Sequence, residues 1–168
     1  LYHFVSKKAL GIAGLGPKIV DVLVDEGLVH TAADFFHLKP EQLLGLPLFA
    51  EVKAEKIVAA IRGRRRVALS RFLYGLGIRH VGEETARSLA RHFGTLKRLR
   101  QAAVNELAAV ADVGDVVAQS IALYFEQAST DKLFTELFDA GVSIEKEERT
   151  APRAGPLAGK SVVVTGTL

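Results

Sequence analysis

The stretch Leu76-Gly77-Ile78-Arg79-His80-Val81-Gly82-Glu83-Glu84-Thr85-Ala86-Arg87-Ser88-Leu89 decides the fold, because its pattern of apolar, glycine and small residues occurs four times. Gly82 serves as the reference position, the anchor, and its equivalents are Gly16, Ala50 and Gly114, at steps of 34, 32 and 32 residues. Apolar residues stand four and one before each anchor, Val or Ala stands four after it, and Leu or Ile stands seven after it. A repeat of this length is typical of a repeated supersecondary unit.

The spacing within one repeat predicts what that unit is. Apolar residues four, seven and eight positions after the anchor form a helical stripe, and a glycine before a helix suits a tight turn where φ is positive. Each unit is therefore predicted to be a helix, a short hairpin and a second helix. We expect a mainly α fold with four such units in one compact domain. Backbone N–H groups at the start of the second helix can hold an anion such as phosphate.

Composition excludes several classes of protein. The chain has 168 residues, of which 49% are hydrophobic and 24% charged, and this balance predicts a globular domain. It contains no Cys, which excludes disulfides and cysteine-ligated zinc. No apolar run reaches the roughly 18 residues of a membrane span. The absence of Cys fits the reducing cytoplasm, and no membrane partner is expected. Since the chain starts at Leu1 and lacks Met, we expect a piece of a longer protein.

Charge is distributed unevenly along the chain. Residues 53–100 contain 13 Lys and Arg against three Glu, a net charge of +10, whereas residues 1–52 carry −2 and residues 101–168 carry −5. A basic segment of this kind attracts polyanions, nucleic acid first among them. An arginine-rich surface that is merely solvated is the alternative interpretation, and charge alone does not decide between the two.

Several local signals predict helix boundaries. Ser6 is expected to cap a helix that runs into Leu10, and the helix after the first hairpin is expected to start at Pro17 and stop near Gly27. Thr31 is predicted to cap the short segment 32–36. Two further boundaries are expected: a helix start near Pro40-Glu41 and a stop followed by a cap at Gly94-Thr95-Leu96.

The C-terminal part of the chain changes character. Leu133, Phe134, Leu137 and Phe138 are helically spaced and are predicted to be core residues that close a helical domain of residues 1–144. Residues 145–156 are polar and contain prolines, which is typical of a linker. In residues 157–168, the run Ser161-Val162-Val163-Val164-Thr165 predicts a strand that begins another domain.

The third hairpin is predicted to be the best phosphate site, since Gly82 is flanked by Arg79, His80 and Arg87. Glu83 and Glu84 favour the start of a helix through its dipole, yet they would repel a phosphate if they faced it. An exposed turn histidine is far commoner than a catalytic one, and no metal ligands or triad partners stand near His80 in the sequence. No catalytic, cofactor-binding or metal-binding residue is predicted.

The other hairpins are predicted to bind less well, in the order first, fourth, second. The first has Gly14, Gly16 and Lys18 but loses one N–H donor at Pro17, and the fourth places Gly114 beside Asp112 and Asp115. The second, Leu48-Phe49-Ala50, has no glycine, so packing explains it better than phosphate contact. The candidate contact residues are Gly14, Gly16, Lys18, Lys53, Arg62, Arg64, Arg65, Arg79, His80, Gly82, Thr85, Arg87 and Gly114.

The basic run Arg62-Gly63-Arg64-Arg65-Arg66 lies between the second and third units. A charge run is usually a solvated surface, but beside anion-binding turns it is also a candidate for contacts to backbone phosphates.

These four turns resemble helix-hairpin-helix motifs. Together with Leu157-Ala158-Gly159-Lys160-Ser161-Val162-Val163-Val164-Thr165-Gly166-Thr167-Leu168, they resemble the C-terminal part of bacterial NAD-dependent DNA ligases over the whole chain. Phe4-Val5-Ser6-Lys7-Lys8-Ala9 and residues 76–83 are especially similar to that family. The resemblance implies that residues 157–168 open a BRCT domain and that a zinc finger and a nucleotidyltransferase core precede Leu1.

What the resemblance implies is a bacterial, nucleoid-associated enzyme that seals nicks in double-stranded DNA during replication and repair. In that family the tandem hairpins bind the duplex across the minor groove without reading sequence, alongside the other domains of the ligase. NAD, Mg and Zn are implied for the parent enzyme only, because this chain has no Lys-x-Asp-Gly adenylation motif. The fragment alone is therefore expected to be non-catalytic and to bind no cofactor.

Three other classes of protein are alternatives. Paired hairpins also occur in other repair proteins, such as excision nuclease subunits and junction-binding proteins, although the BRCT-like end argues against these. A purely protein-binding helical domain would not need glycine turns beside a segment of charge +10. A glycosylase normally has one hairpin that leads to a catalytic Asp, which four even repeats do not suggest.

Overall fold

The computed structural model describes residues 1–148, and these form ten α-helices, one 3-10 helix and a two-stranded sheet. The predicted mainly α fold is confirmed. The predicted BRCT start at residues 157–168 and the predicted linker from residue 149 onward lie outside the described residues. Glu145, the first residue of that linker prediction, is the last residue of strand β2. The elements in chain order are α1 (Tyr2–Val5), α2 (Pro17–Asp25), η1 (Asp34–His37), α3 (Pro40–Leu43), α4 (Glu51–Arg62), β1 (Arg66–Ala68), α5 (Leu69–Gly75), α6 (Glu83–Phe93), α7 (Leu96–Gln101), α8 (Val104–Ala108), α9 (Asp115–Glu126), α10 (Ala128–Asp139) and β2 (Ser143–Glu145).

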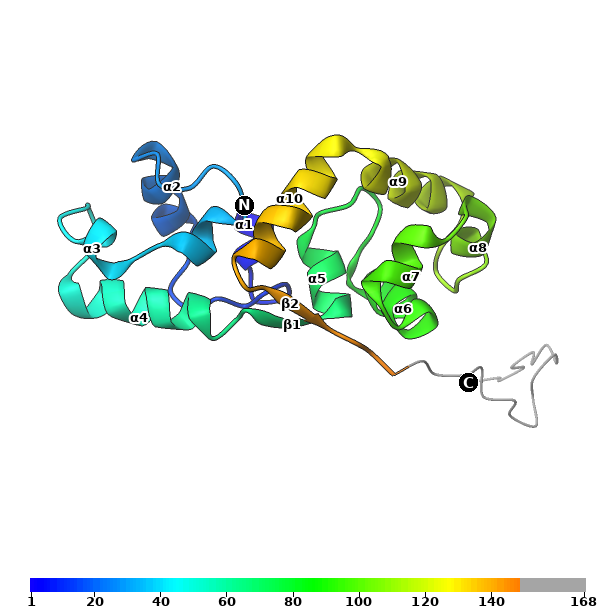
Figure 1. Cartoon of the computed structure of the whole chain (residues 1–168), viewed down its shortest axis with the longest axis horizontal. Coiled ribbons are helices and arrows are strands. Elements are labelled where there is room, and N and C mark those ends of the chain that lie inside the picture. Colours follow the sequence, from blue (N-terminus) through cyan, green and yellow to red (C-terminus); the bar gives the residue numbers. More distant parts are fainter. Residues whose placement is uncertain (149–168) are drawn as a thin grey trace, which may run out of the picture.

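The described part of the molecule is elongated, with helices α2 to α4 at one end and α6 to α9 at the other (Figure 1). Helices α1, α5 and α10 lie between these ends with the sheet, in which β1 and β2 are parallel and Val67 pairs with Ile144. Because β1 follows the second repeat and β2 follows the last helix, the sheet joins segments that are far apart in the sequence. One continuous apolar core runs through all four units.

The repeat positions predicted to pack do so. At four and seven residues after the anchors, all eight side chains are at most 2% exposed: Val20, Leu23, Ala54, Ile57, Ala86, Leu89, Ala118 and Ile121. The small residue at the first of these positions lets each second helix approach its neighbour closely. In α6, the buried stripe Ala86, Leu89, Ala90 and Phe93 ends at Gly94, whose φ of 73° stops the helix, and Thr95 accepts the Arg98 N–H as a cap.

Two predicted helix starts are wrong. Ser6 does not begin a helix; it ends α1, and its hydroxyl donates to the carbonyl of His3. Residues 7–10 form turns instead, because the Arg71 guanidinium binds the carbonyls of Lys7 and Ala9, both at 2.6 Å, which a helix would use internally. The residue that caps η1 is Ala33 rather than Thr31.

The turn before η1 is held by Asp34. Its carboxylate accepts the N–H groups of His30 and Thr31, both at 2.7 Å. Burial alone would raise the pKa of Asp34, but these donors outweigh that effect and lower the pKa below its usual value. This carboxylate therefore belongs to the fold: it satisfies two backbone N–H groups of the turn that precedes η1.

The predicted core stripe of α10 is correct in only part of its length. Phe134 and Leu137 are at most 1% exposed, and Leu133 is half-buried, but Phe138 is 43% exposed. The end of α10 borders a surface hollow there, so Phe138 has no core neighbour on its outer side.

Candidate nucleic-acid interface

All four hairpins share one backbone geometry. They comprise residues 11–16 (hairpin 1), 45–50 (hairpin 2), 77–82 (hairpin 3) and 109–114 (hairpin 4). In each, the N–H one before the anchor donates to the carbonyl four before it, at 3.4, 3.2, 3.0 and 3.1 Å in chain order. Each anchor is the N-cap of the second helix, and its carbonyl accepts the N–H four residues on, at 2.9–3.0 Å.

The left-handed residue of each hairpin is not the anchor, contrary to the prediction. The anchors have extended backbones, with φ of −86° at Gly82 and −98° at Gly114. Positive φ instead occurs two residues before the anchor in all four hairpins, at the position called the apex, which is occupied by Gly14 (88°), Leu48 (71°), His80 (67°) and Asp112 (65°). The first residue of hairpins 1 to 3 is also left-handed, at Gly11, Gly45 and Gly77. The hydrogen bond of the turn joins the residue four before the anchor to the residue one before it. The apex lies between these two residues and takes the left-handed conformation that closes the turn.

The glycine anchors have no internal steric reason to be glycine. A Cβ added to Gly16, Gly82 or Gly114 would meet no atom within 4 Å. Gly14 is different, because a Cβ there would lie 2.9 Å from the Ile57 side chain of α4. The apex glycine of hairpin 1 thus serves packing between the first two units, whereas the three anchor glycines leave their backbone accessible from outside.

Hairpin 3 combines an open anchor with organised charges. Arg79 and His80 are exposed beside Gly82, and Thr85 is half-buried in the first turn of α6. Arg87 donates to Glu83 at 2.7 Å and to Glu84 at 2.8 Å. A cation on the same helix therefore partly neutralises both carboxylates. The repulsion between these glutamates and a phosphate, which the sequence predicts, is weaker as a result.

Two basic residues near hairpin 3 were missed by the sequence analysis. Lys8 reaches Glu83 at 3.2 Å, and Lys7 lines a surface hollow of about 380 Å³ together with Arg71 and Arg87. They come from the start of the chain, some 75 residues from Gly82. No local signal in the sequence brings them there; contact between α1 and α5 does.

Hairpin 1 brings together several predicted residues. Gly14 and Gly16 line a hollow of about 900 Å³ with Arg64, which comes from the basic run after α4. Lys18 is exposed in the first turn of α2, next to Pro17. Hairpin 1 and Arg64 of the basic run therefore share one surface hollow.

The members of the basic run have different environments. Arg62 and Arg64 are exposed. Arg65 is half-buried and donates to the carbonyl of Phe36 at 3.2 Å, and Arg66 pairs with Glu145 at 3.0 Å across the sheet. Arg65 is therefore held by the fold and Arg66 forms an exposed ion pair, whereas Arg62 and Arg64 make no hydrogen bond or ion pair with the described residues.

Hairpin 4 has an open anchor and an engaged apex. The Asp112 carboxylate accepts the Ser88 hydroxyl of α6 at 3.1 Å, and Gly114 is exposed. Asp112 thus attaches this hairpin to the third unit.

In hairpin 2, by contrast, Leu48 and Ala50 are exposed, so the prediction that this turn is explained by packing is wrong for both residues.

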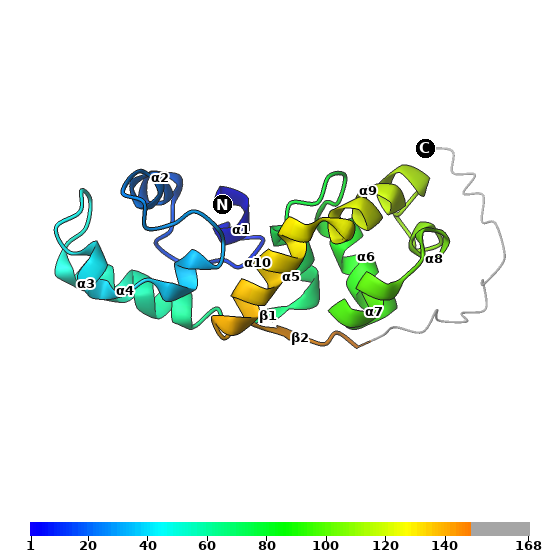
Figure 2. The ribbon, with the colours of Figure 1, turned by 45° about the horizontal axis from the view of Figure 1, so that its top comes forward.

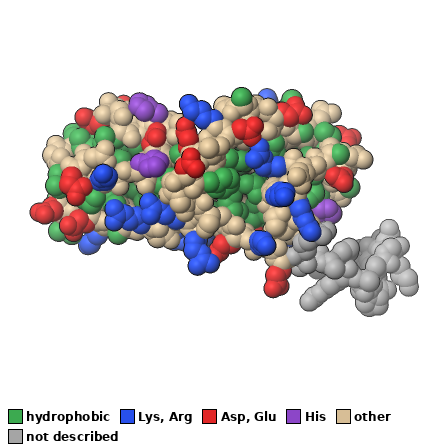
Figure 3. Space-filling view, viewed as in Figure 1, with side chains coloured by type: hydrophobic (Ala, Val, Ile, Leu, Met, Phe, Trp, Pro, Cys, Tyr) green, Lys and Arg blue, Asp and Glu red, His purple; other side chains and the backbone are tan. Residues whose placement is uncertain are grey.

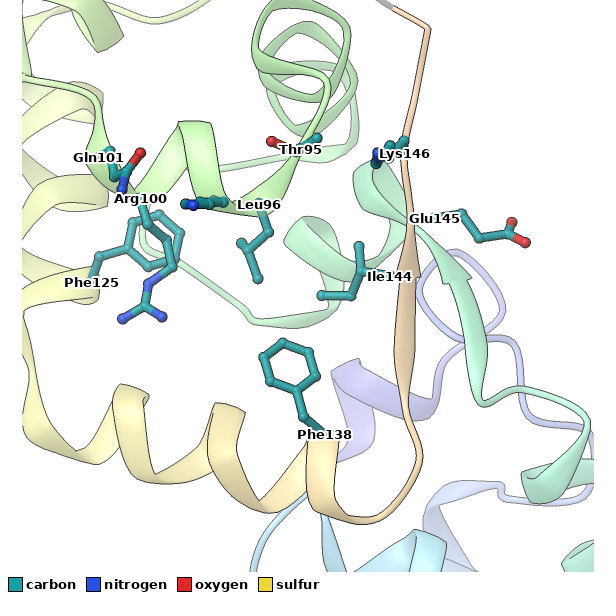
Figure 4. Close-up of a pocket in the computed structure, with 10 residues that line it drawn as sticks. Thr95, Leu96, Arg100, Gln101, Phe125, Phe138, Ile144, Glu145 and Lys146 are labelled. Carbon is teal, nitrogen blue, oxygen red and sulfur yellow. The ribbon is translucent and has the colours of Figure 1, made fainter.

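On the face drawn in Figure 3, Lys and Arg side chains gather in the lower middle part, and apolar side chains form an exposed area in the centre. A hollow of about 580 Å³ lies between α7, α10 and β2, where Leu96, Phe138 and Ile144 point toward one another (Figure 4). None of the predicted contact residues lines it. Glu145 points away from it in Figure 4, consistent with its pairing to Arg66.

Residues 71–134 match the family described as "Helix-hairpin-helix motif", and residues 6–63 match the family described as "SAM-like Helix-hairpin-helix tandem". The first match covers the third and fourth units and the second covers the first two. The chain is a tandem of helix-hairpin-helix motifs. These matches agree with the four shared backbone geometries.

The helix-hairpin-helix chain is homologous along its whole length to a segment of DNA ligases. It is 47% identical over 168 residues to a protein named DNA ligase from Alkalilimnicola ehrlichii, covering 100% of this chain and 25% of that protein. It is also 47% identical over 166 residues to the DNA ligase of Methylococcus capsulatus, covering 99% of this chain and 24% of the relative. The resemblance to DNA ligases is thereby confirmed, and the chain spans about a quarter of the length of these relatives.

Two further findings concern residues 1–148. No helix in this part of the chain is long and apolar enough to cross a membrane. The same residues contain no group of three or more His, Cys, Asp or Glu side chains placed to hold a metal ion.

Proposed function

We propose that this chain is the duplex-binding part of an NAD-dependent DNA ligase. It holds nicked double-stranded DNA on the minor-groove side through hairpin backbone amides and Arg or Lys contacts to phosphates, while other domains of the ligase seal the nick. The observation that carries the proposal is the set of open anchors, Gly16, Gly82 and Gly114, where a side chain would meet nothing in the protein. A Cβ added at one of these anchors would obstruct a phosphate that approaches the N-terminus of α2, α6 or α9.

The physical basis is the set of unpaired N–H groups at each helix start. The first four N–H groups of a helix have no partner within it, and the helix dipole favours an anion beside them. Such contacts position a duplex without reading its sequence. The basic side chains of the proposed surface are Lys18, Lys53, Arg62, Arg64, Arg79 and Arg87, with His80 and Thr85 beside hairpin 3. Arg65 is left out because its guanidinium is bound internally.

The chain's own residues do not fit the cofactors of the parent enzyme. The described residues offer no cluster of metal ligands, and the sequence has neither cysteine nor the adenylation motif. We therefore assign no step of nucleotidyl transfer to this chain. Incubation with NAD should give no covalent AMP adduct, and trapping such an adduct on the chain would contradict the assignment.

The proposal is tested by fluorescence anisotropy of a labelled nicked duplex over a salt series. If about 4–6 phosphates are contacted, log K should fall with log salt at a slope near −4 to −5. Duplexes of different sequence should bind equally within about threefold, because phosphate contacts carry no sequence information. Salt-independent binding, or a tenfold preference for one sequence, would contradict it.

A further inference from the structure

Hairpin 2 has a feature that the fold does not require. Its apex, Leu48, has a φ of 71° although a leucine disfavours the left-handed region, and its side chain is 55% exposed. A glycine at this position would satisfy the backbone at lower cost, as Gly14 does in hairpin 1. Since Leu48 packs against little in the protein, its side chain is explained better by an external contact than by the core.

Leu48 does not stand alone on this surface. Leu44, directly before the hairpin, is 46% exposed, and Val52, two residues after its anchor, is 62% exposed. Phe49 beneath them is only half-buried, unlike its buried equivalents Leu15, Val81 and Val113. The loop between α3 and α4 that carries this surface projects at one end of the molecule (Figure 2). Unit 2 is thus the one with a large apolar side chain at the apex, where the other units have Gly14, His80 and Asp112. The position of Val52 is apolar and exposed in unit 4 as well, at Val116.

A lysine is fixed over the same hairpin. The Lys53 ammonium donates to the carbonyl of Leu48 at 2.8 Å and lies 5.6 Å from the centre of the Phe49 ring. An ammonium group has three donors, so two of them remain for a ligand. Glu51 and Glu55 balance Lys53 and Lys56 along α4. Hairpin 2 therefore has no excess of positive charge, but it has one cation held at its apex.

The anchor of hairpin 2 also differs from the others. The Ala50 methyl group occupies the space that is open at Gly16, Gly82 and Gly114. It obstructs close approach of a phosphate to the backbone amides. Any contact between hairpin 2 and DNA must therefore use side chains.

We propose that hairpin 2 contacts duplex DNA through these side chains: Leu48 lies against the apolar sugar edges of the minor groove, and Lys53 neutralises the adjacent phosphate. This inference rests on the proposed function. Apolar side chains are well suited to the minor groove, where several proteins insert them between or against nucleotides. Charge complementarity supports DNA over a protein partner, because the cation is held at the apex itself.

The position of hairpin 1 also supports duplex DNA as the ligand of hairpin 2. Gly14 of hairpin 1 lies against Ile57 of α4, the helix that follows hairpin 2, because a Cβ added at Gly14 would be 2.9 Å from that side chain. A duplex seated on hairpin 1 therefore has hairpin 2 as its neighbour. The two hairpins would hold it by different chemistry, backbone amides in one and a leucine with a lysine in the other.

The experiment compares Leu48→Gly and Leu48→Asn with wild type by anisotropy on the nicked duplex and by thermal unfolding. Both substitutions relieve the left-handed leucine, so the unfolding midpoint should rise. Affinity should nevertheless fall roughly five- to tenfold, the size expected for losing contact with a leucine side chain. Leu123→Ala, which removes a 61% exposed leucine from α9, is the matched control and should bind within about twofold of wild type.

The contribution of Lys53 is tested separately through the salt dependence of the affinity for the duplex. Lys53→Met should reduce the magnitude of the salt slope by about 1, whereas Lys56→Met should leave it unchanged. This inference would be overturned if both Leu48 variants bound the duplex as tightly as wild type while Gly82→Asp reduced the affinity. The proposed function would remain intact in that case. A fall in affinity together with a lower unfolding midpoint would also overturn the inference, since Leu48 would then be structural. Absence of DNA binding by the wild type would instead overturn the proposed function itself.

Discussion

Hairpins 2 and 3 have the same backbone and different surfaces. Both close the turn with the same hydrogen bond and start their second helix directly after the anchor. Hairpin 3 has an open glycine anchor, a buried Val81 before it and the polar His80 exposed at the apex. Hairpin 2 has Ala50 at the anchor, a half-buried Phe49 before it and the apolar Leu48 exposed at the apex. The fold therefore determines the path of the chain through each hairpin, and it leaves the chemistry of the surface free to vary.

The comparison separates two roles for glycine. At an apex, glycine relieves a left-handed backbone, and at Gly14 it also makes room for Ile57. At an anchor the backbone is extended and the space is open, so glycine there is explained by something that approaches from outside. The two positions should therefore respond differently to substitution.

The largest effect is expected from Gly82→Asp. Asp is a good N-cap, so α6 should stay folded, but its carboxylate would stand where the phosphate is proposed to bind. We expect a loss of about 1–3 kcal/mol in affinity for a nicked duplex, the usual cost of a repelled or unpaired charged contact. Fluorescence anisotropy measures the loss, and circular dichroism verifies the fold.

The matched control is Ala50→Asp in hairpin 2. Ala50 is an exposed N-cap, so Asp there should raise the stability of α4 by about 1 kcal/mol. Its effect on affinity should be smaller than that of Gly82→Asp, because no phosphate is proposed to rest on this anchor. Normal binding by Gly82→Asp with loss of binding by a folded Ala50→Asp would reverse the assignment of the contact surface.

The second prediction concerns stability and compares the two glycines of hairpin 1. Gly14→Ala places a Cβ 2.9 Å from Ile57 Cγ1 at a φ of 88°, so we expect a loss of about 2 kcal/mol in the free energy of unfolding. Gly16→Ala meets nothing and should change that free energy by less than about 1 kcal/mol. Denaturant unfolding of both variants decides, and equal losses would show that the anchor also has an internal role.

The sequence predicted the units well because burial has a fixed period. The residues four and seven after each anchor are buried in every unit, and all four second helices start at the predicted position. The helix stop at Gly94 and the cap at Thr95 were also predicted correctly, since both depend on neighbouring residues only.

Features that depend on distant residues could not be predicted. The Arg71 guanidinium replaces helix by turns after Ser6, and it comes from 62 and 64 positions away from the carbonyls it binds. The pairing of β1 with β2 joins residues 66–68 to residues 143–145, and each strand is too short to be recognised alone. The apex position was missed because only hairpin 1 has glycine there; His80 and Asp112 are types that tolerate positive φ, and Leu48 gives no signal at all.

The third prediction tests the charge beside hairpin 3. Arg79→Met should weaken binding by about 1.5 kcal/mol and reduce the magnitude of the salt slope by about 1, because one phosphate contact is lost. Lys132→Met, on α10, removes an exposed cation that is paired with Glu136 and should change neither quantity. Equal effects of the two substitutions would mean that net charge, rather than hairpin 3, attracts the DNA.

The smallest expected effects come from exchanging the two anchors, Gly82→Ala and Ala50→Gly. The methyl group added at Gly82 has no neighbour within 4 Å at a φ of −86°, so the unfolding free energy should change by less than about 1 kcal/mol. Ala50→Gly opens the anchor of hairpin 2 and should improve affinity by a few tenths of a kcal/mol at most, since Leu48 and Lys53 still cover that hairpin.

The affinity of Gly82→Ala for the nicked duplex is the most direct test of the central claim, that the anchor is glycine for the sake of a ligand. A methyl group that touches nothing in the protein can affect binding only through what approaches from outside. We predict a loss of about 1 kcal/mol, the size of one hydrogen bond to the backbone. Wild-type affinity in this variant, in a protein that otherwise binds DNA with the predicted salt dependence, would contradict the claim.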